Sequence, residues 1–352
     1  TGTCPVFRSR RDAEITLGIY RRVPVLIKEG DPNGNPWGIS FMRMFDMSND
    51  SHLFHTCEDL EDEGWTLDGN VFERPIGEGR VTGAFERMSP LYEAKMISAY
   101  NHRAADVVKS ATAAKRQNQP AYLDEADLRD PSRLAMPLYW VAEDQVPARD
   151  SACRLAFLAI SSPTNARTLT AALIPTVAAG HSVFLLNPGD EVDMCLLVAQ
   201  MNSFALDFVV RQKVSGLNVS FYYVQQFPFL PPSVFERPAP WAPGRNLDEW
   251  VVGRVMNLSL TAVDMRPLAE KLGGEIQPWL PSARRHIMAE LDAAMCHLYG
   301  LDRADVDYVM EAFPIVKRHD ESELGDYRTK RMILEAYDAM QHAIDIGVPY
   351  QS

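Results

Sequence analysis

The chain has 352 residues, 46% of them hydrophobic, and a formal net charge of -12 from 35 Lys and Arg against 47 Asp and Glu. This composition is typical of a folded, soluble protein and excludes a disordered or fibrous chain. The negative charge excludes a protein that coats nucleic acid through bulk positive charge, so any DNA contact must come from a local patch.

The five cysteines are far apart and never form a C-x-x-C pair. This usage argues against a disulfide framework or a zinc knuckle and indicates a reducing compartment, so we expect a cytoplasmic protein. The sequence starts at Thr1 with neither an initiator Met nor a signal segment, and we expect it to be part of a longer protein. The apolar stretch Thr168 to Gly189 is interrupted by Pro175, Gly180 and His181, which predicts two buried strands and no membrane span.

Near the start, the spacing of Ser9 and Asp12 matches a capping box and predicts a short amphipathic helix that Pro24 ends. The apolar and aromatic segment from Trp37 to Met47 predicts a strand. Between Asp46 and Asp68 the chain holds eight acids and no Lys or Arg, which indicates a solvated helix face and loop.

The middle of the chain carries short apolar runs separated by turns. Strands are predicted at Val71 to Glu73, Tyr92 to Ile97, Leu138 to Val141, Arg154 to Ile160, Thr168 to Ile174 and Ser182 to Leu186. The small, polar and basic segment Arg103 to Asn118 is interpreted as a mobile surface loop. A helix is predicted from about Val192 to Lys213, followed by the strand NVSFYYV.

The last third changes character, because its apolar residues recur at helical spacing. Helices are predicted around Leu247 to Ala262, Ala283 to Leu298, Arg303 to Phe313 and Glu323 to Ile344. A Pro-rich stretch from Pro228 to Pro243 precedes them. We therefore expect an α+β fold, with a mixed β-sheet domain over residues 1–235 and a helical C-terminal subdomain over residues 236–352.

Several kinds of catalytic chemistry have no support in the sequence, so no catalytic or metal-ligating residue is predicted. No Gly-rich turn suits S-adenosylmethionine or a dinucleotide, and neither an Asn-Pro-Pro-aromatic nor an Asp-Pro-Pro-aromatic loop is present to bind a flipped base. His52 and His55 lack partner ligands at zinc spacing, and no G-x-S-x-G surrounds a serine. Glu93-Ala94-Lys95 matches half of a magnesium-dependent nuclease motif, which leaves self-contained cleavage as a third hypothesis.

Several long segments of the chain carry a family resemblance. They are CPVFRSRRDAEITLGIYRRVPVLI from Cys4, WGISFMRMFDMSNDSHLF from Trp37, PLYEAKMISAYNHR from Pro90, SSPTNARTLTAALIP from Ser161, MNSFALDFVVRQKVSGLNVSFYYVQQFPFLPP from Met201, and AELDAAMCHLYGL, FPIVKR and YRTKRMILEAYDAM in the helical tail. Together they resemble the C-terminal half of large bacterial restriction-modification proteins. In that family an adenine-N6 DNA methyltransferase precedes a TaqI-like target-recognition domain and a helical tail. The resemblance extends from Cys4 to about Met340.

The resemblance implies that this chain is the DNA specificity region and that the catalytic domain lies upstream of it. It implies double-stranded DNA and that methyltransferase domain as partners, and no membrane. S-adenosylmethionine is expected in the upstream domain and no cofactor in this chain. One departure is Ala94, where such proteins often have Gly, because a Cβ alters a close backbone approach.

Phosphate contacts need Lys, Arg or exposed amides, and Arg, Asn and Gln read bases in the major groove. The predicted DNA-binding residues are Arg8, Arg10, Arg11, Lys95, Lys109, Lys115, Arg116, Asn165, Arg167, Thr168, Arg211, Lys213 and Asn218. The leading hypothesis is a sequence-specificity module of a restriction-modification or phage-defence methyltransferase. The alternative is a protein-interaction scaffold of a defence complex, which would bind partners through the helical tail and the acidic face.

Overall fold

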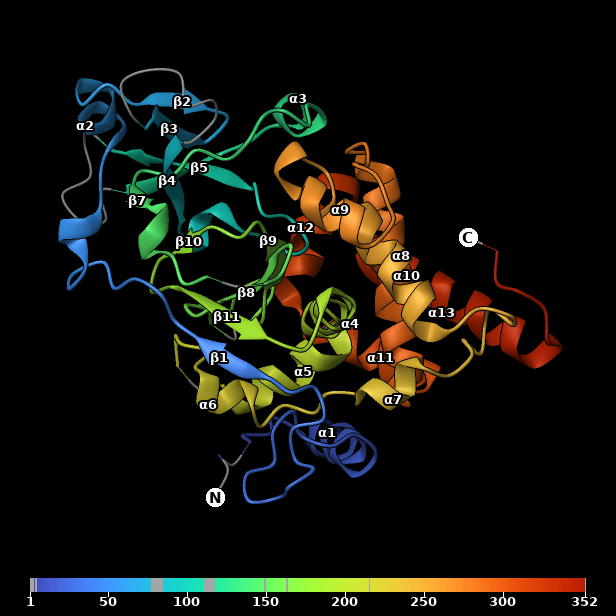
Figure 1. Ribbon diagram of the computed structural model, residues 1–352. Coiled ribbons are helices and arrows are strands. Elements are labelled where there is room, and N and C mark those ends of the chain that lie inside the picture. Colours follow the sequence, from blue (N-terminus) through green and yellow to red (C-terminus); the bar gives the residue numbers. More distant parts are fainter. Residues whose placement is uncertain are drawn as a thin grey trace.

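The computed structural model describes residues 3, 5–76, 85–110, 118–148, 150–162, 164–214 and 216–351. Strands occupy one side of the molecule in Figure 1 and helices from the second half of the chain occupy the other. Antiparallel sheets and a helical C-terminal stretch together confirm the predicted α+β class.

The central sheet consists of β1 (Ser40–Met42), β11 (Val183–Asn187), β8 (Arg154–Leu158) and β9 (Ala171–Ile174), in that spatial order and with antiparallel neighbours. The strands predicted around β8, β9 and β11 are therefore confirmed. The long strand predicted from Trp37 to Met47 is reduced to the three residues of β1.

Both faces of the central sheet are buried, which explains its continuous apolar runs. Leu155 and Phe157 face the large hydrophobic cluster beneath α4, whereas Ala156 faces a second cluster with Tyr92 and Met96. Side chains of successive β8 residues thus point to opposite faces of the sheet, as the two-residue period of a strand requires.

A second sheet follows the order β10 (Ala178–Ala179), β4 (Phe85–Tyr92), β3 (Val71–Pro75) and β2 (Thr66–Asp68), with β7 (Trp140–Ala142) also paired to β4. Only the β10–β4 pairing is parallel among these described strands. The strand predicted from Tyr92 to Ile97 is wrong, because β4 ends at Tyr92 and a 3-10 turn, η2 (Ala94–Met96), follows.

The loop predicted from Arg103 to Asn118 is also wrong for the part that the structure describes, since β5 (Ala105–Lys109) pairs with β6 (Asn118–Tyr122). Arg103 is fully buried and its guanidinium donates to backbone carbonyls, among them those of Leu128 and Thr261, both at 2.6 Å. A buried guanidinium that bonds several carbonyls fixes the start of this hairpin.

The single helix predicted from Val192 to Lys213 is two helices, α4 (Glu191–Met201) and α5 (Phe204–Lys213), whose axes differ by 66°. Asn202 interrupts the helix because its side chain exchanges two hydrogen bonds with the backbone of Ala171, at 3.0 and 2.8 Å. Ser203 then caps α5 by accepting from the Leu206 N–H at 3.2 Å. Most of α4 is buried, as expected for a helix that is apolar all round.

The segment NVSFYYV, predicted as a strand, contains the short helix α6 (Phe221–Val224). Its first aromatic ring packs against the sheet: the ring centroids of Phe221 and Phe184 are 4.2 Å apart. Tertiary aromatic packing therefore overrides the local strand preference of this sequence.

Four of the remaining helices begin and end close to the predictions: α1 (Arg10–Arg22), α8 (Leu247–Ser259), α10 (Pro281–Leu298) and α11 (Arg303–Glu311). The helix predicted from Glu323 to Ile344 corresponds to α13 (Arg328–Ile346), but Glu323 itself belongs to α12 (Pro314–Leu324). The acidic stretch contains the short helix α2 (Cys57–Asp62), and no helix was predicted at α3 (Glu125–Arg129), α7 (Pro232–Phe235), α9 (Arg266–Lys271) or α12. The predicted capping box of α1 is present, with Asp12 N–H donating to Ser9 Oγ at 3.0 Å.

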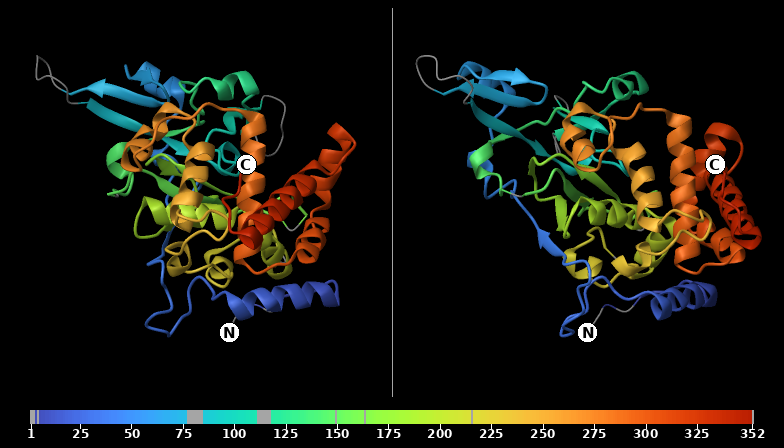
Figure 2. Two further views of the ribbon diagram at one scale, coloured as in Figure 1. Left: turned by 90° about the vertical axis from the view of Figure 1, so that its right-hand side faces the viewer. Right: turned by 45° about the vertical axis from the view of Figure 1, so that its right-hand side comes forward.

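One hydrophobic cluster connects the two predicted domains, because it runs from Ile15 in α1 through α4 and α5 to Met340 in α13. The side views in Figure 2 show α1 at one end of the molecule and the β2–β3 region at the other. Among the described helices no single one is long and apolar enough to span a membrane, although the bent pair α4–α5 together meets the length and composition requirement.

Candidate nucleic-acid interface

An open groove of about 560 Å³ lies between η2, the turn that joins β8 to β9, and α10. It brings together three of the predicted DNA-binding residues, Lys95, Asn165 and Arg167, from distant parts of the sequence. Its floor is made largely of small side chains, and Tyr122, at the end of β6, stands at its wall. We call this feature the basic groove; its lining residues are Ala94, Lys95, Ile97, Ser98, Ala99, Ala104, Tyr122, Leu158, Asn165, Ala166, Arg167, Thr170 and Met288.

Lys95 enters the groove from the 3-10 turn η2, beside a buried carboxylate. Its Nζ lies 2.6 Å from Oε2 of Glu93, whose side chain is 9% exposed against 28% for Lys95. The pair holds the ammonium in place at the groove wall and neutralises part of its charge. The remaining donors of Lys95 are still available to an anion.

Asn165 is an exposed residue of the β8–β9 turn, and Arg211 fixes its backbone. Arg211 Nη2 donates to the carbonyl of Asn165 at 2.6 Å and to that of Ala166 at 2.9 Å. The Arg211 side chain is only 6% exposed, and its Nε lies 3.4 Å from Oδ2 of the fully buried Asp207. Arg211 therefore positions the β8–β9 turn through its backbone carbonyls, from the buried side of the turn.

Arg167 follows in the same turn and anchors it to the helices. Nη1 donates to the Asn202 carbonyl at 2.7 Å, Nη2 lies 3.4 Å from Asp292 Oδ2, and the guanidinium carbon lies 3.3 Å from the Phe204 ring centroid. The side chain keeps 14% of its surface exposed, at the groove.

Thr168 is fully buried, and its N–H donates to the Asp207 carboxylate at 3.0 Å. Asp207 therefore holds the backbone of the turn as well as the Arg211 side chain. These buried hydrogen bonds and ion pairs hold the β8–β9 turn in position, as is typical of binding loops on a fixed scaffold.

Burial shifts the pKa values of two side chains beneath the β8–β9 turn. It raises the pKa of Asp292 to about 6, although Arg167 and the Phe204 N–H both favour the ionised carboxylate. Burial also lowers the pKa of Arg211, and Asp207 opposes this effect.

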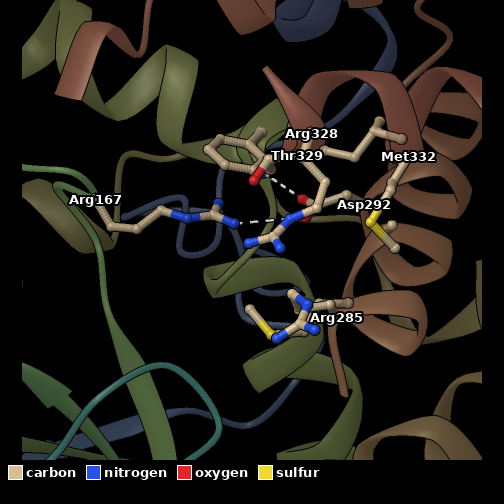
Figure 3. A pocket seen from close by; sticks show the side chains of 10 residues that line it. Arg167, Arg285, Asp292, Arg328, Thr329 and Met332 are labelled. Carbon is tan, nitrogen blue, oxygen red and sulfur yellow. Dashed lines mark hydrogen bonds and ion pairs between the residues drawn. The ribbon is translucent and has the colours of Figure 1, made fainter. Parts of the chain in front are cut away.

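A smaller cavity of about 70 Å³ adjoins the basic groove, and Arg167 and Met288 line both. Figure 3 shows Arg167 reaching into it from one wall and Arg328 from the other, with Arg285 at a third side. Phe204, Met332 and Ile333 supply apolar lining. We call it the arginine cavity.

The other predicted DNA-binding residues lie elsewhere or are engaged by the protein. Lys213 Nζ lies 3.1 Å from Gln226 Oε1, and Asn218 is exposed and forms an isolated antiparallel β-bridge with Ile160. Lys109 is exposed at the end of β5, and Lys115 and Arg116 lie outside the described residues.

The arginines near the N-terminus are all exposed. Arg10 pairs with Glu14 at 2.8 Å, Arg11 pairs with Asp305 of α11, and Arg8 precedes α1. The basic groove does not include them.

Sequence reasoning missed Tyr122 and Arg285. Tyr122 is 76% exposed, which is unusual for a large aromatic side chain, but it lies beyond the loop predicted from Arg103 to Asn118, and the sequence analysis predicts nothing for it. Arg285 belongs to the helical tail, which we interpreted as a protein-contact surface. The only available signal was an Arg284-Arg285 pair at the start of a predicted helix.

Within the described residues, no group of three or more His, Cys, Asp and Glu side chains could hold a metal ion. Comparison with protein-family models and with curated proteins found no match for this sequence.

Proposed function

We propose that this chain is the DNA sequence-specificity region of a restriction-modification or phage-defence adenine methyltransferase. The basic groove carries the proposal. It combines an ammonium on Lys95, an exposed aromatic ring on Tyr122 and an exposed amide on Asn165. These groups suit phosphate contact, base stacking and recognition of an adenine edge.

The proposal agrees with the charge of the chain. With a formal net charge of -12, the protein has to bind DNA through a local patch, and the basic groove brings Lys95 and Arg167 together at one surface, each beside a carboxylate. Only a few phosphates would be contacted, so binding should be weak and should fall with salt with a slope near the number of contacts.

The remaining parts of the proposal rest on the family resemblance. A methyltransferase domain outside this chain would bind S-adenosylmethionine and modify the adenine, while this chain would grip the duplex beside it. Such a system works in the cytoplasm. The helical tail would contact the catalytic domain.

A selection experiment tests the proposal. A pool of random duplexes is titrated with the chain at low and moderate salt, and the bound fraction is sequenced. We expect enrichment of one short adenine-containing site, with weaker binding for Lys95→Ala and Tyr122→Ala. Lys28→Ala is the matched control, because Lys28 also pairs with a nearby acid, Asp31 at 3.0 Å, but does not line the basic groove.

Other outcomes count against the proposal. Equal binding by the groove variants and the control would remove the basic groove from the interface. Salt-insensitive binding to a protein partner with none to DNA would favour the scaffold alternative. Magnesium-dependent cleavage lost in Lys95→Ala would favour the nuclease alternative.

A further inference from the structure

The arginine cavity holds more positive charge than its own carboxylates neutralise. Arg167, Arg285 and Arg328 line it, and a guanidinium keeps its proton at neutral pH. Asp292 is the only acidic residue in the described lining, and it pairs with Arg167. Like charges that converge on a partly enclosed site repel one another strongly unless an anion lies between them.

The other two guanidiniums retain free donors. Arg328 Nη2 forms an ion pair with Asp320 Oδ1 at 3.9 Å, which is beyond hydrogen-bond distance, and Asp320 Oδ2 accepts from the Thr329 N–H at 2.6 Å. Arg285 is exposed and makes no hydrogen bond or ion pair with any residue that the structure describes.

The amino end of α13 adjoins the cavity. Arg328 and Thr329 are the first two residues of this 19-residue helix. The amino end of a helix carries partial positive charge, which the Asp320 carboxylate partly offsets here by accepting from the Thr329 N–H. In Figure 3, Arg328, Thr329 and Met332 all extend from this helix toward the cavity.

We propose that the arginine cavity binds one phosphate-type oxyanion through Arg167, Arg285 and Arg328. Its volume of about 70 Å³ leaves room for a small ligand between the three guanidiniums. Planar guanidinium forks match phosphate oxygens in pairs, which makes arginine the usual residue for this ligand.

The oxyanion has two sources. A backbone phosphodiester of DNA in the basic groove is the first, because Arg167 and Met288 line both features; this source rests on the proposed function. Free phosphate is the second and is independent of DNA binding.

The test compares the full chain with Arg285→Gln, Arg328→Gln and the control Arg318→Gln, whose exposed arginine on α12 also has no ion pair or hydrogen bond with the described residues. Calorimetry measures inorganic phosphate binding against chloride at equal ionic strength. We expect each cavity variant to weaken phosphate binding about tenfold or more, since a charged hydrogen bond is lost. Circular dichroism verifies that each variant is folded.

DNA binding by the same variants distinguishes the sources. Competition between phosphate and duplex DNA assigns the site to a backbone phosphodiester, and binding of both together assigns it to free phosphate. A tenfold loss of DNA affinity in both cavity variants also supports the site if wild-type chain binds no free phosphate.

The inference is overturned if the cavity variants match the control in both phosphate and DNA binding. If the wild-type chain binds no DNA, the proposed function fails and the phosphate measurement alone decides on the cavity.

Discussion

Arg167 Nη2 lies 3.4 Å from Asp292 Oδ2 and joins the β8–β9 turn to the middle of α10. The same carboxylate accepts from the Phe204 N–H through Oδ1 at 2.7 Å, at the start of α5. One buried carboxylate thus connects the turn of the basic groove to two helices of the core.

Asp292→Ala is expected to destabilise the fold by about 3–5 kcal/mol, because it leaves the Arg167 guanidinium and the Phe204 N–H without their partner. Asp292→Asn should cost much less, since an amide oxygen still accepts from Phe204. Urea unfolding followed by circular dichroism measures both variants. Equal losses for Ala and Asn would mean that volume, and not hydrogen bonding, determines the effect.

The pH dependence of stability reports on the same carboxyl. Burial raises the pKa of Asp292 to about 6 in the folded state, above the value of about 3.9 in an unfolded chain. The folded state therefore binds the proton more tightly, and this group's contribution to stability is present below about pH 4 and is lost as the pH rises through about 6. Urea unfolding between these pH values should show a steeper loss for the wild type than for Asp292→Asn. Identical slopes would assign the pH dependence to other groups.

Arg211→Ala is expected to lower the free energy of unfolding by about 3–5 kcal/mol, because Asp207 would remain fully buried without its cation. The variant would also release the carbonyls of Asn165 and Ala166. A loss of DNA binding in Arg211→Ala therefore has to be compared with the free energy of unfolding of the same variant. Unchanged stability with lost binding would instead make Arg211 a direct DNA contact.

Much of the fold could be predicted from the sequence, because apolar periodicity reports burial directly. The strands around Leu155, Leu173 and Leu185 and the helices of the last third are examples. Predictions failed where tertiary contacts decide the local conformation: Asn202 breaks a helix through Ala171, 31 residues earlier in the chain.

The candidate site was predictable only in part. Lys95, Asn165 and Arg167 were selected for charge and turn context, and they meet at one groove. The burial of Arg211 and Thr168 could not be predicted, because it depends on Asp207, a single acid in an apolar helix whose contacts with both residues form only in the fold. The exposure of the Tyr122 side chain also depends on tertiary packing, which the hydrophobic pattern around it does not indicate.

Arg103→Lys is expected to destabilise the fold by several kcal/mol although the charge is kept. Its two terminal nitrogens donate to carbonyls in two directions, for example Nη1 to Asp130 at 2.7 Å and Nη2 to Thr261 at 2.6 Å. An ammonium has three donors at one point and cannot reproduce this fork, so buried carbonyls lose their partners at about 1–3 kcal/mol each. Chemical denaturation measures the loss, with the exposed Arg129→Lys as the control. A loss as small as that of the control would mean that the carbonyls find other donors.

Tyr122→Ala is expected to separate binding from stability. Its side chain is 76% exposed, so the free energy of unfolding should change by no more than about 0.5 kcal/mol. Stacking of a base on the ring would contribute about 1–3 kcal/mol to DNA binding, which Ala removes and Phe keeps. If Tyr122→Phe binds as weakly as Tyr122→Ala, the hydroxyl and not the ring makes the contact, and a stacking role for Tyr122 is excluded.

Lys95→Ala is expected to change the salt dependence of DNA binding. It removes one phosphate contact, so the slope of log affinity against log salt should fall by about 1 for every DNA sequence alike. Fluorescence anisotropy at several salt concentrations measures this slope and also the affinities of the Tyr122 variants.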